Sequence, residues 1–349
     1  MKLASTLWFW IGLPVVIALH AHDSDGRQHV VALDDCPTFI PFDQFLNQVE
    51  LATYGEYEDD EVESEAEFYK MKQHVLYMYE GIRRPAAISS FVQGEQYVDC
   101  VPIYEQPTYY HLKLPSIAEP PEVSTPPPTG GGDTPGNTSD ADSPLKLGLK
   151  DPFGNPISCH EGSIPMTRLT LHSLTIFRTL NDFFSKGRRV PPDNFDSSDP
   201  LHPRDLPDWD VHHHDYGTQT IDDFGGNSWV NLWNPFANFS LSQQWYVGGS
   251  DCDTQTVEGG WQVADWWGTN GQAVLFIYYT NHNYNLSGCF TATQFGCYNL
   301  DCPAFCQKNH NWHLGGIWDH YSSLDREQWG FGMVTSLPSP LTRIPMKAD

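Results

Sequence analysis

Strand-like segments dominate this chain of 349 residues from about residue 146 onward and limit the folds open to it. Three stretches rich in aromatic and β-branched residues lie between Gly, Asn and Asp turns: Trp245-Tyr-Val-Gly, Trp261-Gln-Val and Leu275-Phe-Ile-Tyr-Tyr-Thr. Helical periodicity is scarce there, and ten of the twelve tryptophans follow residue 200. About 200 residues of this kind predict one all-β domain, either a sandwich or a barrel.

The amino terminus has the layout of a secretory signal peptide, and we expect residues 1–21 to be removed. A basic start precedes an apolar run from Leu7 to Leu19, with small residues near its end. A membrane anchor is the alternative, but the run contains Pro14 and a span needs about 20 apolar residues. We therefore expect a secreted, extracellular protein with no membrane segment once the signal is removed.

The charge balance is strongly acidic, with 19 basic and 44 acidic residues and a net charge of −25. Such a surface repels phosphate backbones, which argues against nucleic acid as a partner. Protonation at low pH relieves the self-repulsion of an acidic chain, so the composition suits an acidic environment.

Cysteines and sequons fit the secretory pathway. An even number of cysteines predicts disulfides in an oxidising compartment. The eight are Cys36, Cys100, Cys159, Cys252, Cys289, Cys297, Cys302 and Cys306. Asn137, Asn238 and Asn285 each begin a glycosylation sequon. Cys297 and Cys302 could form a zinc half-site, but a small disulfide loop suits this compartment better.

Beyond the signal the chain divides into three blocks: a first folded block (23–112), a linker (113–147) and a second folded block (148–349). An acidic run from Glu50 to Glu67 leads into apolar residues at three- and four-residue spacing, which predicts an amphipathic helix. These apolar residues are Phe68, Met71, Val75 and Met78. The linker is rich in Pro and Gly, cannot build a core, and is the kind of segment that proteases cut.

Glu258 is a lone carboxylate in the aromatic region, followed by Gly259 and Gly260. A buried charge is costly unless it is paired or hydrogen-bonded, and the two glycines permit a bulge or a close backbone approach. Beside Trp245 or Trp261, a partly desolvated glutamate could act as a general acid or base. A structural glutamate at a strand edge is the alternative, and the pattern alone favours it.

Other chemistry gains less support from the sequence. Asp265, Asp319 and Glu327 could supply a second acid, although each is more typical of an ordinary surface residue. Consecutive residues of a strand point to opposite faces, so the cluster His212-His-His-Asp215 cannot hold one ion without a turn. His310 and His313 lie three residues apart without a predicted helix, and no G-x-S-x-G elbow occurs. We expect no metal and no cofactor.

Several ordered motifs resemble the neprosin family of secreted glutamic peptidases. In the second block these are Cys159-His-Glu-Gly-Ser-Ile-Pro-Met-Thr-Arg, Asn231-Leu-Trp-Asn-Pro, Phe239-Ser-Leu-Ser-Gln-Gln-Trp-Tyr-Val, Glu258-Gly-Gly-Trp-Gln-Val, Phe276-Ile-Tyr-Tyr-Thr and Gly296-Cys-Tyr-Asn-Leu-Asp-Cys. In the first block Glu67-Phe-Tyr-Lys-Met-Lys, Tyr79-Glu-Gly and Val98-Asp-Cys are similar to the neprosin activation peptide.

The resemblance implies a β-sandwich of two antiparallel sheets preceded by a small α+β prosegment. It also implies acid-active endoproteolysis after proline, with proline-containing peptides or proteins as substrates and the chain's own prosegment as inhibitor. Glu258 matches the first catalytic glutamate of the family, and Trp245, Trp261 and Tyr279 are expected to bind substrate.

Two departures from the family pattern are visible. Gly288-Cys-Phe before Gly296-Cys-Tyr looks like a short insertion, and Glu327-Gln-Trp-Gly matches a strand that precedes the family's second catalytic glutamate. We therefore expect that glutamate to be missing and the catalytic domain (148–349) to be truncated. A catalytically dead sandwich that binds proline-rich or cell-wall polymers is the alternative.

For the disulfides we expect a Cys36–Cys100 bond that closes the prosegment and a Cys297–Cys302 bond. The other four cysteines cannot be paired from the sequence; they are Cys159, Cys252, Cys289 and Cys306.

Overall fold

The chain forms two compact units, residues 1–39 and 40–349. The computed structural model describes residues 40–80, 82, 89–93, 96–114, 158–186, 217–218, 220, 225–285 and 296–336, and the backbone of 20–22 and 28–30. In the first unit β1 (His20–His22) and β2 (Gln28–Val30) pair antiparallel. No helix within these described ranges is both long and apolar enough to span a membrane.

Two helices open the second unit: α1 (Phe42–Leu51) and α2 (Glu65–Tyr79), with the 3-10 turn η2 (Tyr54–Glu56) between them. Ser64 caps α2 by accepting a hydrogen bond from the Glu67 N–H at 3.3 Å. The acidic first turn of α2 suits the positive end of the helix dipole. The predicted apolar stripe is fully buried, which confirms the helix; its members are Phe68, Met71, Val75 and Met78.

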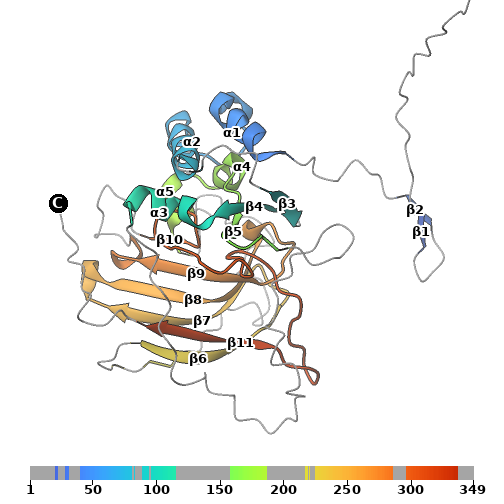
Figure 1. Cartoon of the computed structure of the whole chain (residues 1–349), viewed down its shortest axis with the longest axis vertical. Helices are drawn as coiled ribbons and strands as arrows, with labels where there is room; N and C mark the ends of the chain where they lie inside the picture. The colour runs from blue at the N-terminus through green and yellow to red at the C-terminus, as the bar shows by residue number, and fades with distance from the viewer. Residues whose placement is uncertain are drawn as a thin grey trace, which may run out of the picture. The chain divides into compact units, whose positions relative to one another are not determined.

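A three-stranded antiparallel sheet joins the two predicted folded blocks. Its order is β3 (Ser90–Gln93), β4 (Gln96–Pro102) and β5 (Ser163–Thr167). The 3-10 turn η3 (Ile103–Glu105) and α3 (Pro107–Leu112) follow β4. Because β5 follows the predicted linker, the sheet connects chain segments on either side of it (Figure 1).

Arg168, at the end of β5, ties this sheet to the first helix. Its guanidinium donates to both carboxylate oxygens of Asp99, at 2.9 and 2.6 Å, and the two side chains are each 1 % exposed. It also donates to the Ile40 carbonyl at 2.6 Å and lies 5.0 Å from the Phe45 ring centroid. A paired, hydrogen-bonded and aromatic-lined guanidinium is the form in which a buried charge is stable.

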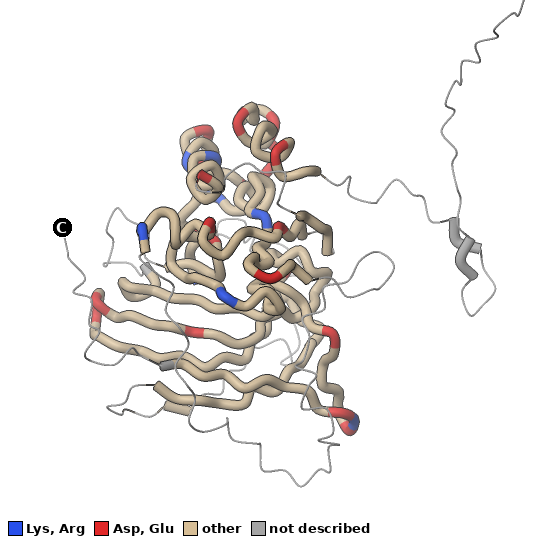
Figure 2. The backbone as a smooth tube through the Cα atoms, viewed as in Figure 1, with Lys and Arg blue, Asp and Glu red and all other residues tan. Residues whose placement is uncertain are grey.

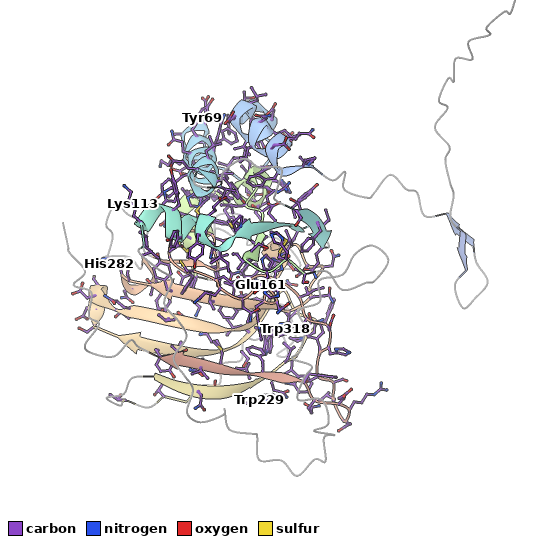
Figure 3. The ribbon with its side chains drawn as sticks, in the orientation of Figure 1. Tyr69, Lys113, Glu161, Trp229, His282 and Trp318 are labelled. Atoms are coloured by element: carbon purple, nitrogen blue, oxygen red, sulfur yellow. A yellow bond between two sulfur atoms is a disulfide. The ribbon has the colours of Figure 1, made fainter. Side chains whose placement is uncertain are left out.

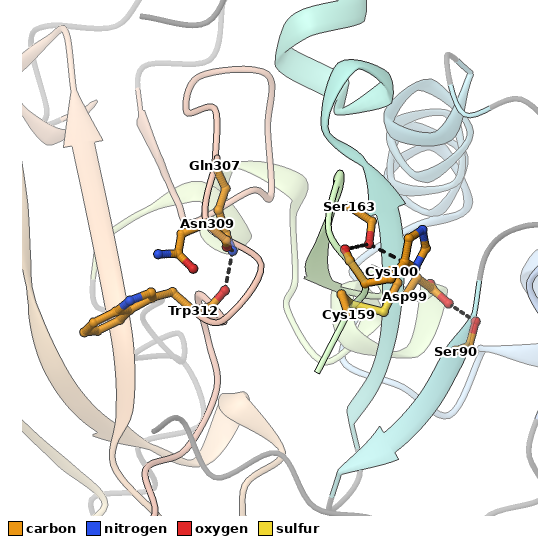
Figure 4. The surroundings of a disulfide bond; sticks show 9 residues. Ser90, Asp99, Cys100, Cys159, Ser163, Gln307, Asn309 and Trp312 are labelled. Carbon is orange, nitrogen blue, oxygen red and sulfur yellow. Dashed lines mark hydrogen bonds between the residues drawn. A yellow bond between two sulfur atoms is a disulfide. The ribbon is translucent and has the colours of Figure 1, made fainter. Parts of the chain in front are cut away.

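The disulfides differ in part from the prediction. Cys100 on β4 bonds to Cys159, so the predicted Cys36–Cys100 bond is wrong (Figure 4). Pairing of β4 with β5 is the physical reason, because it brings the two Cα atoms to 5.4 Å. The Cys297–Cys302 bond is confirmed, whereas Cys36 lies outside the described residues. Cys252 is also disulfide-bonded, and Cys306 is a free thiol.

Two short helices, α4 (Leu171–Thr175) and α5 (Leu180–Phe184), follow β5 and pack against α2. The threonine before each helix caps it through a reciprocal side-chain and backbone pair. One core includes side chains from both sides of the linker, among them Phe45, Phe68, Leu174, Phe183 and Leu300. The first block is therefore built into the same core as the second.

The remaining strands form the sandwich that the sequence predicted. One antiparallel sheet has the order β10 (Gly296–Tyr298), β9 (Val274–Thr280), β8 (Gln255–Ala264), β7 (Phe239–Gly248). The other pairs β6 (Gly225–Asn231) with β11 (Gly330–Ser336). The 3-10 turns η7 (Asp251–Asp253), η8 (Asp265–Trp267) and η9 (Asn283–Asn285) flank β8 and β9. The all-β class, preceded by a small α+β region, is confirmed.

The two sheets pack through a mostly apolar layer. The Trp261 indole N–H of β8 donates to the Asn231 carbonyl of β6 at 2.8 Å, and Trp318, labelled in Figure 3, stacks on Phe331 of β11 with ring centroids 4.7 Å apart. A Cβ at Gly260 would lie 1.9 Å from the Ser242 carbonyl oxygen. A Cβ at Gly259 would instead meet the Met333 side chain of β11. Since the β7–β8 register is continuous here, Gly260 serves close backbone approach, Gly259 makes room for Met333, and neither forms a bulge.

Candidate functional site around Glu258

Glu258 lies in the middle of β8, directly between Trp245 of β7 and Tyr278 of β9. It is 2 % exposed. No other charged residue occurs in the six strands of the sandwich, all of which the structure describes, and their tube is almost uniformly tan in Figure 2. A carboxylate this deeply buried must be paired or hydrogen-bonded to be stable.

Three side chains donate to this carboxylate. Oε1 accepts hydrogen bonds from the Thr256 hydroxyl at 2.8 Å and the Tyr284 hydroxyl at 2.7 Å. Oε2 accepts one from the Lys186 ammonium, which also forms an ion pair with it. Hydrogen bonds to an ionised acceptor are stronger than neutral ones, so both oxygens are firmly held.

Tyr284 reaches Glu258 from a strained turn after β9. Its φ of 55° and ψ of 20° place it in the left-handed region, which a bulky side chain rarely adopts. The Thr280 hydroxyl oxygen supports the turn by accepting from the Tyr284 N–H at 3.1 Å. Burial raises the pKa of Tyr284, so its hydroxyl keeps the proton that it donates. Strain of this kind is concentrated at functional sites.

Lys186 follows α5 and brings the only cation that contacts Glu258 in the part of the chain that the structure describes. Its Nζ also donates to Gln243 Oε1 at 3.0 Å and lies 5.8 Å from the ring centroids of both Tyr278 and Tyr284. The side chain is 19 % exposed. Burial lowers the pKa of Lys186 to about 8, so the amine is an ammonium at neutral and acidic pH.

The structure separates the residues that the sequence grouped around Glu258. Trp245 is its cross-strand neighbour and shares its face of the sheet. Alternation along β8 puts Trp261 on the opposite face, where it meets β6, so the expectation that Trp261 adjoins Glu258 is wrong. Tyr279 also lies on the face opposite Glu258, with its hydroxyl 3.7 Å from the Cys302 sulfur.

A comparison with family models matches residues 237–336 to the Neprosin family. The matched segment spans β7 to β11 and includes Glu258. Over these residues the chain is similar to the Neprosin family. This similarity is consistent with a peptidase-like function, and the matched segment contains Glu258, Thr256 and Tyr284. The predicted resemblance of the first block to an activation peptide lies outside the matched residues.

The other acids that the sequence offered lie elsewhere in the Neprosin segment. Asp265 begins η8 beyond the end of β8, and Asp319 and Glu327 precede β11. Within the described residues the contacts of Glu258 come from Thr256, Tyr284 and Lys186, so no second carboxylate joins the site.

The histidines within the described residues do not form a metal site. His313 is fully buried and its Nε2 lies 2.8 Å from the Thr167 hydroxyl, while His212, His213 and His214 lie outside the described residues. The described ranges hold no group of three His, Cys, Asp or Glu side chains placed to bind an ion.

The three sequons fall in different places. Asn238 is exposed in the turn before β7, Asn285 ends η9, and Asn137 lies outside the described residues. Separately, a cavity of about 190 Å³ lies between α4 and the turn after β8, and Glu258 is not one of the residues that line it. Its walls include Arg168, Ile176, Phe183, Trp266 and Leu300.

The sequence missed three of the functional side chains. Thr256 could have been found, because residues two apart on a strand share a face and Thr256 precedes Glu258 by two. Lys186 and Tyr284 carry no local signal, since their contacts with Glu258 depend on how distant segments pack.

Proposed function

We propose that this chain is a secreted glutamic endopeptidase that cleaves preferentially after proline at acidic pH, and that it is made as a zymogen. The observation that carries the proposal is Glu258: a buried carboxylate, alone in the sandwich strands, held by two hydroxyls beside a strained turn. The match of residues 237–336 to the Neprosin family supports peptide-bond chemistry. The ring of Trp245, on the face of Glu258, supports a preference for the flat apolar ring of proline.

In the proposed reaction one carboxylate, that of Glu258, transfers a proton in two steps. Glu258 takes a proton from a water molecule as the water oxygen bonds to the substrate carbonyl carbon. When the C–N bond breaks, the proton passes to the leaving nitrogen. Thr256 and Tyr284 hold the carboxylate in one orientation, which supports a fixed position for the attacking water.

The first block is proposed to act as the inhibitor. Its helix α2 packs against α5, which leads directly to Lys186, and the Leu180 N–H of α5 donates to Glu67 of α2 at 3.4 Å. The docked block thus supports the segment whose lysine covers Glu258. Prolines in the linker are available sites for self-cleavage after secretion, which the amino-terminal signal favours.

The test is cleavage of a proline-containing peptide at acidic pH, before and after the linker is cut. Mass spectrometry of the products should show cleavage on the carboxyl side of proline, with little cleavage of a matched peptide that carries alanine there. Products that do not depend on the proline would contradict the specificity.

A non-catalytic sandwich that binds proline-rich or cell-wall polymers is the second candidate. The observation that favours it is that both oxygens of Glu258 are engaged and no second described carboxylate is in contact with it. Saturable binding of a proline-rich peptide without any turnover, in linker-cut protein, would support this function over the first.

A further inference from the structure

The surroundings of the Lys186 ammonium have the composition of a cation-binding site. A carboxylate oxygen of Glu258 and an amide oxygen of Gln243 accept from Nζ. The rings of Tyr278 and Tyr284 stack, with 9° between their planes and 6.3 Å between centroids, and each lies 5.8 Å from the same nitrogen. Anionic and amide acceptors beside aromatic faces are the groups that recognise ammonium ions in proteins.

Lys186, which occupies this site, is part of the same chain but does not lie on the sheet whose residues form the site. Glu258, Gln243 and Tyr278 stand on neighbouring strands and Tyr284 on the turn after β9, whereas Lys186 follows a helix of five residues. Strand pairing therefore positions the residues that form the site, whereas the packing of α5 positions Lys186.

We propose that Glu258, Gln243, Tyr278 and Tyr284 form a binding site for a primary ammonium group on an alkyl chain, that Lys186 fills it as a tethered ligand, and that a peptide ammonium group enters when Lys186 leaves. The ammonium chemistry is shared by a lysine side chain and a free amino terminus. The proposal deepens the proposed function, since it concerns the same carboxylate, but ammonium binding does not require that the site cleave peptides.

Charge balance explains why the replacement should be a cation. Removing one partner of a buried ion pair leaves an uncompensated charge, which is strongly destabilising. When Lys186 leaves, Glu258 must either take up a proton or receive another cation. A bound Lys186 also covers Oε2, so water and substrate cannot use that oxygen until the lysine moves.

The experiment is chemical rescue of a Lys186→Ala variant of the full-length chain. The substitution should lower the Tm, and n-butylammonium should restore it saturably, because the added cation binds the folded form. The uncharged analogue n-butanol should not. Lys70→Ala is the matched control, since Lys70 also pairs with a glutamate, Glu67, but 60 % of the Lys70 side chain is exposed; this variant should show no rescue.

Glu258 should be required for the rescue. In a Lys186→Ala, Glu258→Gln double variant n-butylammonium should have no effect on the Tm. Equal rescue of the double variant, or none in Lys186→Ala, would overturn the proposal and leave Lys186–Glu258 as a structural ion pair. If Lys186→Ala does not fold, refolding with n-butylammonium should recover soluble protein and refolding with n-butanol should not; equal yields would overturn it too.

Two further ligands separate the sources of the ammonium. Nα-acetyl-lysine amide carries only a side-chain ammonium, and alanine amide carries only an α-ammonium. Rescue by the first alone identifies a lysine side chain, and rescue by the second alone identifies an amino terminus. Failure of the proposed peptidase activity would leave these Tm measurements unaffected, so the two proposals fail separately.

Discussion

The hydroxyl groups of Thr256 and Tyr284 hold Glu258, the one charged residue in the strands of the sandwich. Thr256 donates to Glu258 at 2.8 Å and is 3 % exposed. Hydrogen bonds to charged groups contribute about 1.5–3 kcal/mol, so Thr256→Val should lower the free energy of unfolding by that amount. Thr269→Val is the matched control, because Thr269 is equally buried and donates to the neutral Gln272 carbonyl at 2.8 Å. Thr269→Val should lower the free energy of unfolding by about 0.5–1.5 kcal/mol, as measured by urea denaturation at neutral pH. Equal losses in the two variants would contradict the account.

His74 makes the docking of α2 sensitive to acid. Its Nε2 lies 2.8 Å from the Asp301 carbonyl and its ring meets Phe184 edge-on, and burial lowers its pKa from 6.5 to about 4. Above pH 6.5 the imidazole is neutral in both states, so it contributes nothing to pH dependence. Between pH 6.5 and about 4 the unfolded chain takes up a proton that the folded chain excludes, so stability falls by roughly 3 kcal/mol.

A His74→Gln variant should lose less stability over that pH range, by the share that His74 contributes, because glutamine does not titrate. His313, whose pKa burial lowers to about 3, should keep its own contribution. Unfolding midpoints across a pH series measure this. His172→Gln, at an exposed histidine of α4, is the control and should leave the pH dependence unchanged. An unaltered acid loss in His74→Gln would show that other groups cause it.

Individual residues also show which parts of the site could be predicted from the sequence and which could not. Glu258 could be singled out because it is a lone charge among strands, and the Neprosin match covers its position. Alternation along one strand could have sorted the face of Trp261 from that of Glu258, whereas the face of Tyr279 depends on the β8–β9 register. Lys186 could not have been placed, since 72 residues separate it from Glu258 and helix packing alone brings them together.

At the scale of elements, the pairing of β4 with β5 changes what a cut in the linker can do. The Cys100–Cys159 bond spans the linker, so cleavage there should leave the two pieces covalently joined. A gel should show one species without reductant and two with it.

In Cys159→Ser the two pieces should separate in denaturant without reductant. In Cys297→Ser they should stay joined, because that bond lies within the second block. Separation of the wild-type pieces without reductant would contradict the assignment.

The Arg168–Asp99 pair should contribute most among the ion pairs at this junction. Both side chains are 1 % exposed, so Arg168→Met leaves a buried carboxylate without its cation and should cost about 3–5 kcal/mol. Arg178→Met is the control: Arg178 pairs with Glu63 at 3.7 Å where both are more than a third exposed, and about 0–1 kcal/mol is expected. Similar losses measured by urea denaturation would refute the ranking.

Elements with a local pattern were predicted, and those that depend on distant partners were not. The spacing of Phe68, Met71, Val75 and Met78 predicted α2, and the aromatic runs predicted β7, β8 and β9. The pairing of β4 with β5 left no such trace, because it joins segments on either side of a linker that the sequence marks as a boundary.

For the whole molecule, the shared core gives the first block two roles. Side chains from α1, α2, α4, α5 and the Cys297–Cys302 loop pack in one cluster, so the block stabilises the fold as well as supporting α5. Acid acts on both roles through His74, and it also relieves the repulsion that a net charge of −25 creates. Low pH should therefore weaken the packing of α2 on α5.

The central claim is that Glu258 performs the chemistry. Linker-cut wild type and Glu258→Gln should be compared on one proline-containing peptide at acidic pH, with Glu161→Gln, at an exposed glutamate, as the control. Since proton transfer by a positioned carboxylate contributes at least about a hundredfold, Glu258→Gln should lose that much kcat or more and Glu161→Gln none. Unchanged cleavage by a folded Glu258→Gln variant would contradict the account.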